Sequence, residues 1–128
     1  MSYSLNWKPI QSKEEFNRVV EDSREKPALV FKHRPSAPES MQALKTMESD
    51  WSISPEDLDL YMVDIMKDKA IAELVTDVAG VMNEYPQVLL FADGVTMYDE
   101  SREMISVKKI KLALKIINRT FKWMETRV

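Results

Sequence analysis

The sequence contains no cysteine among its 128 residues. That absence excludes disulfide bonds, a cysteine nucleophile and thiolate ligands for a metal ion. Histidine is nearly as scarce: His33 is the only one, and a single imidazole is too few for a typical zinc site. We therefore predict no bound metal and no cofactor.

Long apolar runs and a strong excess of one charge are also missing. No run approaches the roughly 18 apolar residues typical of a membrane span, and the first residues do not resemble a secretory signal. The net charge of -3 argues against general nucleic-acid binding. We expect a cytoplasmic protein that binds neither membranes nor nucleic acid. With 45% hydrophobic residues, the chain is long enough for one domain, residues 1–128, with a real core.

Strand and helix patterns alternate along the chain. Ser12 and Glu15 form a capping box that begins a helix, and Asp93-Gly94 between two apolar runs predicts a hairpin turn. The expected strands cover residues 5–10, 28–33, 58–65, 87–92 and 95–98; the expected helices cover 12–25, 37–51, 67–80 and 106–124. This order predicts an α/β fold with a mixed sheet of about four to five strands, helices on both faces, a closing hairpin and a C-terminal helix.

Apolar residues at spacings of three and four predict which faces of the later helices are buried. The third helix has four such positions and the last helix has five. They are Ile71, Leu74, Val75 and Val78 in the third helix, and Ile110, Leu114, Ile117, Phe121 and Met124 in the last.

The segment from Ala28 to Ser40 is central to the functional interpretation. Its apolar start has the length of a buried strand, and Ser36 or Ala37 caps a helix with Pro38 in its first turn. A strand that turns directly into a helix leaves backbone N–H groups unpaired at the sheet edge, which suits an anion, a thiolate or a nucleophile. Ala37 occupies the position where a reactive side chain is expected, and alanine has none.

Three segments together resemble the YtxJ family of monothiol bacilliredoxins, which have a thioredoxin-like fold. They are Lys26–His33, with its Phe-Lys-His end, Ser36–Ser40, and Tyr85–Leu90, with its Pro-Gln-Val sequence. The resemblance covers roughly residues 5–122. It implies thiol–disulfide exchange, in which a cysteine at a helix start removes bacillithiol, a low-molecular-weight thiol, from mixed disulfides on proteins.

The resemblance also implies roles for individual residues. Ala37 takes the position of the family's cysteine, followed by Pro38 and by Ser40 at the motif serine. Pro86 takes the position of a cis-proline beside Ala37. Together with Ser36 and Tyr85, these residues form the expected substrate-binding set, with bacillithiol as the thiol ligand and proteins carrying mixed disulfides as partners.

Alanine at position 37 cannot perform the reaction that the family implies. Three explanations remain open: natural divergence that kept the fold, an engineered Cys→Ala change, or another role at the same edge. We favour natural divergence, because Arg34, Pro35 and Glu39 also depart from the motif. The first functional hypothesis is an oxidoreductase by descent that is inactive as written. The alternative is a non-catalytic module that holds a protein segment or a small thiol in the thioredoxin-type groove.

Two further residues are candidates at the same edge of the sheet. His33 ends the first central strand, where it could orient a ligand or carry a proton, although a strand-end histidine with a satisfied hydrogen bond is the interpretation we favour. Asp64, near the end of the next strand, opens toward the same edge if the two strands are parallel. A carboxylate that stabilises a turn explains Asp64 equally well.

Overall fold

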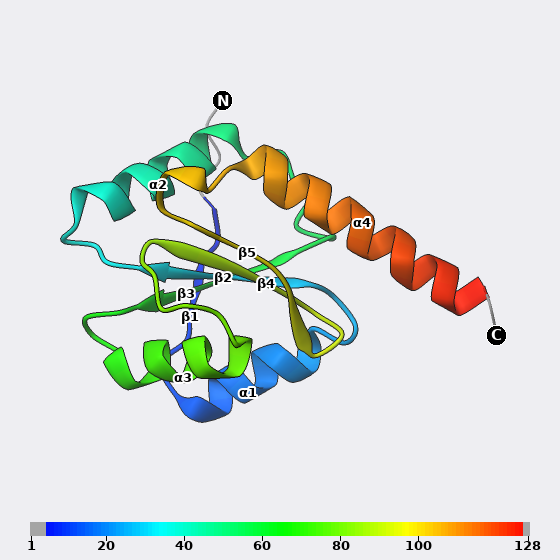
Figure 1. Ribbon diagram of the computed structural model, residues 1–128, viewed down its shortest axis with the longest axis horizontal. Coiled ribbons are helices and arrows are strands. Elements are labelled where there is room, and N and C mark those ends of the chain that lie inside the picture. Colours follow the sequence, from blue (N-terminus) through cyan, green and yellow to red (C-terminus); the bar gives the residue numbers. More distant parts are fainter. Residues whose placement is uncertain (1–4, 127–128) are drawn as a thin grey trace.

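A five-stranded mixed sheet runs through the middle of the molecule (Figure 1). The computed structural model describes residues 5–126, and their side chains up to residue 120. In spatial order the strands are β1 (Lys8–Pro9), β3 (Asp59–Asp64), β2 (Ala28–His33), β4 (Gln87–Ala92) and β5 (Val95–Ser101). The first three are parallel, and β4 is antiparallel to both of its neighbours. The predicted mixed α/β sheet is confirmed.

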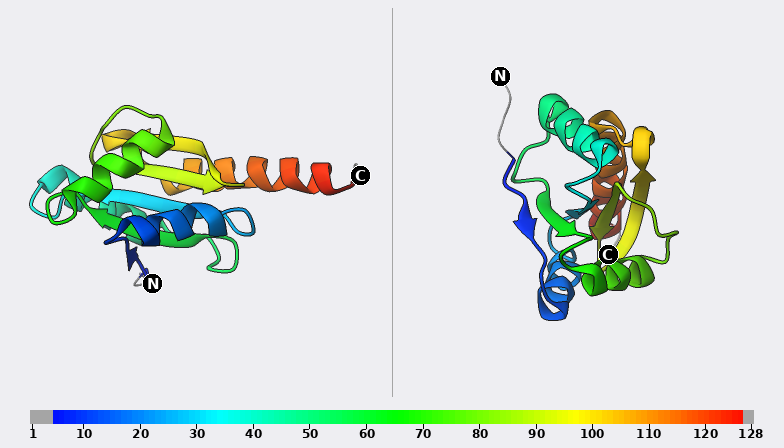
Figure 2. Two further views of the ribbon diagram at one scale, coloured as in Figure 1. Left: turned by 90° about the horizontal axis from the view of Figure 1, so that it is seen from below. Right: turned by 90° about the vertical axis from the view of Figure 1, so that its left-hand side faces the viewer.

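Helices cover both faces of this sheet, as Figures 1 and 2 show. On one face α1 (Lys13–Asp22) and α3 (Lys69–Ala79) bury Phe16, Val19 and Val75 against alternate residues of β2 and β4. On the other face, α2 (Pro38–Asp50) and α4 (Val107–Thr126) bury a second core. Because β2 is covered on both sides, all six of its residues are buried, including Lys32 and His33.

Local sequence signals explain several element boundaries. The hydroxyl of Ser12 accepts a hydrogen bond from the Glu15 N–H at 3.1 Å, which confirms the predicted cap of α1. Asp93 and Gly94 have φ angles of 53° and 79°, the left-handed pair that a tight hairpin between β4 and β5 requires. The predicted helix start and the predicted hairpin are therefore both present.

Two sequence predictions about these elements need correction. The edge strand is confined to Lys8–Pro9 instead of residues 5–10, because Pro9 cannot donate a ladder hydrogen bond. Val78 is 52% exposed, although its spacing predicted burial. Helix α3 is rotated so that Ala72, Val75 and Thr76 face the sheet, and Thr76 there accepts a hydrogen bond from a buried charge.

The last helix, α4, extends beyond the edge of the sheet (Figure 2). Its predicted buried positions Ile110, Leu114 and Ile117 are confirmed; the side chains of Phe121 and Met124 lie outside the described residues. None of the helices in residues 5–126 is both long enough and apolar enough to cross a membrane.

Candidate functional site

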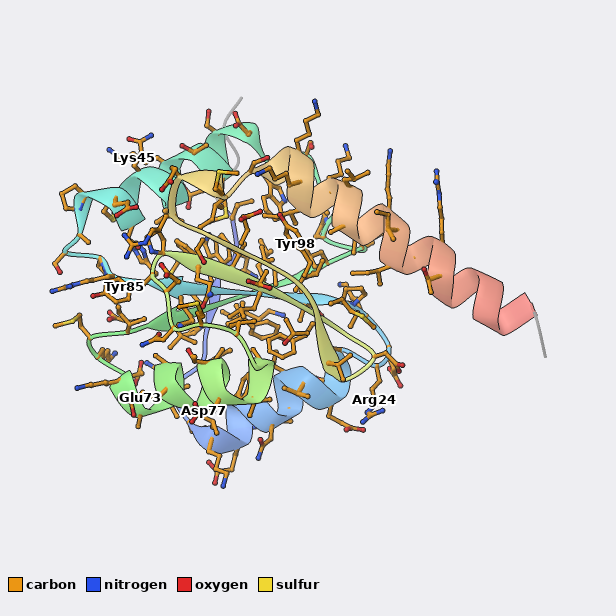
Figure 3. The ribbon with its side chains drawn as sticks, viewed as in Figure 1. Arg24, Lys45, Glu73, Asp77, Tyr85 and Tyr98 are labelled. Carbon is orange, nitrogen blue, oxygen red and sulfur yellow. The ribbon has the colours of Figure 1, made fainter. Side chains whose placement is uncertain are left out.

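The end of β2, the start of α2 and the loop before β4 meet at one edge of the sheet. Antiparallel pairing of β2 and β4 ends at Lys32 and Gln87, so the next residues, His33 and Pro86, lie opposite each other. The guanidinium of Arg34 lies 5.8 Å from the centre of the Tyr85 ring. Figure 3 shows Tyr85 at this end of the molecule, well separated from the β4–β5 hairpin, where Arg24 lies. We call residues 34–39, 84–86 and Arg102 the Ala37–Pro86 site.

One side of the site is the uncapped start of α2. Ala37 is the N-cap residue, with extended backbone angles, and no side chain makes a capping hydrogen bond there. Of the two predicted cap positions, Ser36 and Ala37, the structure has Ala37; Ser36 precedes it and is exposed. Pro38 occupies the first helical position, where its missing N–H costs nothing. The methyl group of Ala37 thus lies where backbone N–H groups favour negative charge.

His33 holds the start of α2 in place from the interior of the fold. Its Nδ1 lies 2.6 Å from the Ser40 hydroxyl in the first turn of α2, and its ring stacks on Phe31 at 5.0 Å between ring centres. The same hydroxyl oxygen accepts a hydrogen bond from the Arg34 N–H at 2.9 Å. The Ser40 hydroxyl hydrogen is thus free to point at Nδ1, which fits a neutral imidazole protonated at Nε2. The interpretation of His33 as a satisfied strand-end histidine is confirmed.

Burial sets the protonation state of His33. The ring is 3% exposed, and this burial lowers the pKa of His33 from its ordinary value, while the charge of Asp64 acts in the opposite direction. Ser40 is fully buried in the same contact. Both of its interactions hold the turn from β2 into α2, which gives this member of the expected substrate-binding set a structural role.

Asp64 has the structural role that was the alternative to ligand binding. The parallel register pairs it with His33, so both reach the same edge, as predicted. Its carboxylate, however, accepts hydrogen bonds from the N–H groups of Met66 and Lys67 at 2.9 and 3.0 Å. Asp64 stabilises the turn that follows β3.

The other side of the site is the loop that contains the cis Tyr85–Pro86 peptide bond. Pro86 itself is buried, and Tyr85 is half-buried. The main-chain oxygen of Pro86 accepts a hydrogen bond from the Arg102 N–H at 2.9 Å. The resemblance implied a cis-proline at this position.

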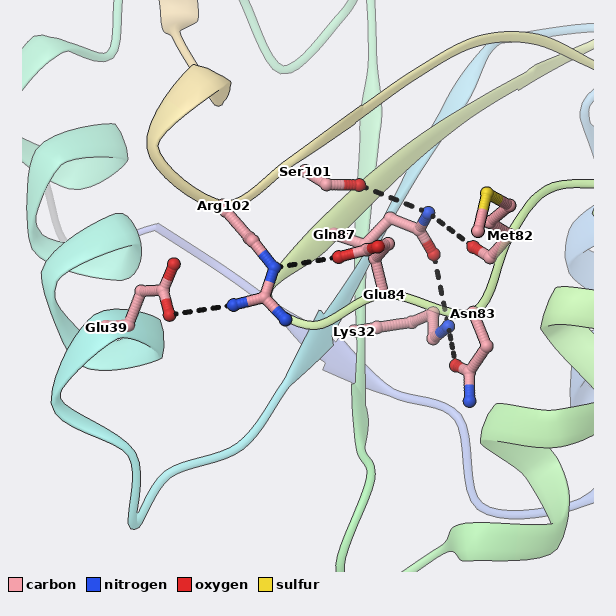
Figure 4. A network of polar contacts seen from close by, with 8 residues as sticks. All are labelled: Lys32, Glu39, Met82, Asn83, Glu84, Gln87, Ser101 and Arg102. Atoms are coloured by element: carbon pink, nitrogen blue, oxygen red, sulfur yellow. Dashed lines mark hydrogen bonds and ion pairs between the residues drawn. The ribbon is translucent and has the colours of Figure 1, made fainter.

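Sequence reasoning missed the residue that holds this loop from inside. The ammonium of Lys32 is fully buried and donates to Thr76 Oγ1 at 2.6 Å, Asn83 Oδ1 at 2.8 Å and Gln87 Oε1 at 3.1 Å. Figure 4 shows the contacts with Asn83 and Gln87. Lys32 and His33 are consecutive in β2 and point to opposite faces. They therefore hold the two sides of the site, the loop and the helix start. A lysine inside an otherwise apolar strand was the available signal.

An exposed arginine joins the two sides from outside. The Arg102 guanidinium contacts Glu84 of the loop at 2.8 Å and Glu39 of α2 at 3.1 Å (Figure 4). The hydrogen bond to Glu84, with the charges of both carboxylates, raises the pKa of Arg102. Arg102 also has a φ of 56°, a left-handed backbone angle that is uncommon for a residue other than glycine. This conformation places its side chain between the loop and the helix.

The described residues offer no alternative centre of metal chemistry. Within residues 5–126, no cluster of three or more His, Cys, Asp or Glu side chains could hold a metal ion.

A cavity of about 810 Å³ is lined by Trp51, Leu58 and Leu60, with eight further residues. It adjoins the C-terminal end of α2, whereas Ala37 lies at the N-terminal end, and its lining includes no residue of the predicted site.

Comparison with known proteins identifies the family. The family model of the monothiol bacilliredoxin BrxC matches residues 8–110. The chain belongs to the monothiol bacilliredoxin family. The match includes the Phe-Lys-His end of β2, Ala37 and Pro86, which confirms the family resemblance found in the sequence.

Solved structures support the thioredoxin fold of this bacilliredoxin. One, proposed to be an oxidoreductase with a thioredoxin fold, has a TM-score of 0.72 at 22% identity over 83% of this chain and 91% of its own. Thioredoxin from Trypanosoma brucei brucei has a TM-score of 0.69 at 12% identity, covering 89% and 92%. Malassezia sympodialis thioredoxin has a TM-score of 0.66 at 16% identity, covering 86% and 89%.

The family's chemistry and this sequence differ at one decisive atom. Thiol–disulfide exchange needs a thiolate as the attacking group. At the start of α2, where the family resemblance places the cysteine, this chain has the methyl group of Ala37. No cysteine elsewhere in the 128 residues can replace it. The chain is therefore a bacilliredoxin by family and fold that is inactive in thiol–disulfide exchange as written.

Proposed function

We propose that this bacilliredoxin is a non-catalytic binding module whose Ala37–Pro86 site holds a protein segment that carries a mixed disulfide with bacillithiol. The observation that supports it most strongly is that both sides of the site are held by hydrogen bonds from buried side chains although the nucleophile is missing. His33 and Ser40 place the helix start, and Lys32 places the loop. Each of these bonds is worth about 1 kcal/mol or more.

The backbone beside Pro86 can accept an extended segment. In the described part of the chain, the Tyr85 N–H and C=O make no hydrogen bond to another protein group. An extended peptide pairs with such free backbone groups at the edge of a sheet. The uncapped start of α2 then faces the disulfide of the bound segment, with a methyl group in place of a sulfur atom, so the adduct is bound without being cleaved.

The partner therefore combines an extended backbone with a small thiol adduct. The thiol expected from the family is bacillithiol, and its protein adducts would meet this chain in the cytoplasm, where low-molecular-weight thiols keep protein thiols reduced. The free peptide and its bacillithiol adduct are predicted to differ in affinity, because only the adduct fills the space next to Ala37.

Fluorescence anisotropy tests this proposal. The probe is a labelled peptide of about ten residues whose central cysteine carries bacillithiol, compared with the same peptide as a free thiol. The unmodified chain should bind the adduct more tightly, and Ala37→Trp, which fills the site, should weaken binding at least tenfold, or about 1.4 kcal/mol. Val78→Trp is the matched control, because it adds the same ring at an exposed position of α3. Equal affinities for both peptides, or no effect of Ala37→Trp, would overturn the proposal.

A further inference from the structure

The buried ammonium of Lys32 connects three elements that are distant in sequence. Its acceptors lie on α3 (Thr76), in the loop before β4 (Asn83) and on β4 itself (Gln87), at 2.6, 2.8 and 3.1 Å. An ammonium group has three hydrogen atoms, so all of its donors are used. Lys32 therefore bridges the sheet, a helix and a loop through one fully satisfied charge.

Two of these acceptors bracket the loop that carries Pro86. Asn83 precedes the Glu84–Pro86 segment and Gln87 follows it, so Lys32 holds the segment at both ends. The side-chain amide of Gln87 also donates to the Met82 carbonyl at 3.0 Å, which closes the loop on itself. Figure 4 shows Lys32 on the inner side of the loop and Arg102 on the outer side.

The protonation energetics of Lys32 indicate that stability does not explain its presence. Burial lowers its pKa to about 8, and the opposing effect comes from the Glu84 carboxylate, which Arg102 also holds. The groups from α3 and β4, Thr76 and Gln87, are neutral. A buried charge that is harder to protonate than in water costs stability. What the charge provides at this position is a fixed geometry for three acceptors.

We propose that Lys32 is a positioning residue for the Ala37–Pro86 site, whose ammonium fixes the loop from Asn83 to Gln87, and with it Tyr85 and Pro86, without touching what binds there. The inference rests on the proposed function for its biological purpose, and on the hydrogen bonds alone for its structural content. Loss of the charge leaves two N–H donors for three acceptors. The loop therefore loosens when Lys32 loses its proton, and ligand binding weakens with it.

Nuclear magnetic resonance tests the structural part without any ligand. In Lys32→Met, backbone order parameters of Asn83, Glu84 and Tyr85 should fall from about 0.85 to below about 0.6. The Arg102 N–H, which donates to the Pro86 carbonyl, should exchange with solvent at least about tenfold faster, because its acceptor is no longer held. The exposed Asn83→Ala keeps the charge and removes one attachment of the loop, and it should show the same changes. Unchanged order parameters and exchange in both variants would overturn the proposal.

A control separates placement of the loop from general loss of stability. Val30→Ala changes a fully buried residue two positions earlier in β2, in the core on the same face as Lys32. Val30→Ala should destabilise the fold but leave the order parameters of residues 83–85 as in the unmodified chain. The exchange rate of the Arg102 N–H, corrected for the lower global stability, should also stay unchanged. The same loosening in Val30→Ala as in Lys32→Met would count against a specific role for the lysine.

A restored thiol tests the functional part. In an Ala37→Cys background the introduced thiolate attacks the bacillithiol sulfur of the peptide adduct, a new disulfide forms to bacillithiol, and the peptide leaves as its thiolate. Adding Lys32→Met should slow this reaction about tenfold, because the loss of the fixed loop should cost about as much as one hydrogen bond. The rate with a small symmetrical disulfide should change by less than about twofold. With Lys32 present, the ratio of the two rates should fall as the pH rises through about 8.

The outcomes are distinguishable. Loosening of the loop together with a selective loss of the peptide reaction supports both the role of Lys32 and the proposed function. Loosening of the loop with no peptide preference in the Ala37→Cys background supports placement by Lys32 and overturns the proposed function. Equal slowing of both reactions in Lys32→Met, with the loop unchanged, overturns the role of Lys32.

Discussion

Replacing Ser40 by alanine is predicted to destabilise the fold through two groups that lose their partners. The hydroxyl serves both His33 Nδ1, at 2.6 Å, and the Arg34 N–H, at 2.9 Å. A buried polar group left without a partner costs about 1–3 kcal/mol. His33 is fully enclosed and should lie in the upper part of that range, whereas the Arg34 N–H is only partly buried and should lie near its lower end.

The net effect follows from these terms and one opposing term. The two orphaned groups together cost about 3–4 kcal/mol, and the better helix propensity of alanine in the first turn of α2 returns about 0.5 kcal/mol. Removing one oxygen leaves almost no cavity. Ser40→Ala should therefore lower the free energy of unfolding by about 2.5–3.5 kcal/mol, a large fraction of the stability of a domain of this size.

Urea unfolding followed by tryptophan fluorescence measures this difference, with the m-value checked for constancy so that the change can be attributed to stability. Ser36→Ala is the matched control: it removes a hydroxyl four residues earlier, exposed and without a capping role, and should change stability by less than about 0.5 kcal/mol. Equal effects of the two substitutions would refute the assignment of Ser40 as the group that holds the helix start.

Three further predictions concern charge. As the pH falls below about 6.5, the free energy of unfolding should fall in the unmodified chain and fall less in His33→Gln. The reason is that the lowered pKa of His33 in the folded state lets the unfolded state take up the proton first. Parallel pH profiles of the two chains would contradict this. Between about pH 8 and 10.5 the unfolded chain still holds the Lys32 proton, whereas the folded chain has lost it. The free energy of unfolding of the unmodified chain, measured relative to Lys32→Met, should therefore rise by about 3 kcal/mol as the pH rises through this range. A difference that stays constant with pH in urea titrations would refute the burial argument. Arg102→Gln should leave the free energy of unfolding nearly unchanged, since its ion pairs are exposed and screened by solvent, yet it should raise the mobility of Glu84 in relaxation measurements. A clear loss of stability would contradict this account of the contact.

Periodicity and turn chemistry predicted most of the fold because those signals are local. Ser12 with Glu15, and Asp93 with Gly94, act within a few residues, and the structure confirms both. Val78 shows the limit of the approach. Its spacing fits a buried stripe, but α3 is turned so that Thr76 can reach the Lys32 ammonium, and this contact spans 44 residues of sequence. No local pattern contains that requirement.

The candidate site divides in the same way. The helix start at Ala37 and the cis-proline at Pro86 could be predicted from family resemblance, and their common edge of the sheet from strand order. The roles of Ser40 and Lys32 could not, because each depends on partners brought together by the fold. Ser40 belongs to a motif that suggests ligand contact, yet its hydroxyl is used up by the backbone and by His33. A lysine near the end of a strand is expected to reach solvent, but Lys32 lies in the core.

The central claim is that this bacilliredoxin keeps the helix start at Ala37 and the cis-proline loop at Pro86 of a thiol site and lacks the thiol itself. The most direct test is the release of bacillithiol from a peptide mixed disulfide by the unmodified chain and by Ala37→Cys, with the pKa of the introduced thiol titrated in parallel. The unmodified chain should release none. Ala37→Cys should form the bacillithiol adduct and free the peptide thiol, with a thiol pKa below about 8.5 because the start of α2 favours the anion. An accessible thiol at position 37 with an ordinary pKa and no exchange would contradict the account.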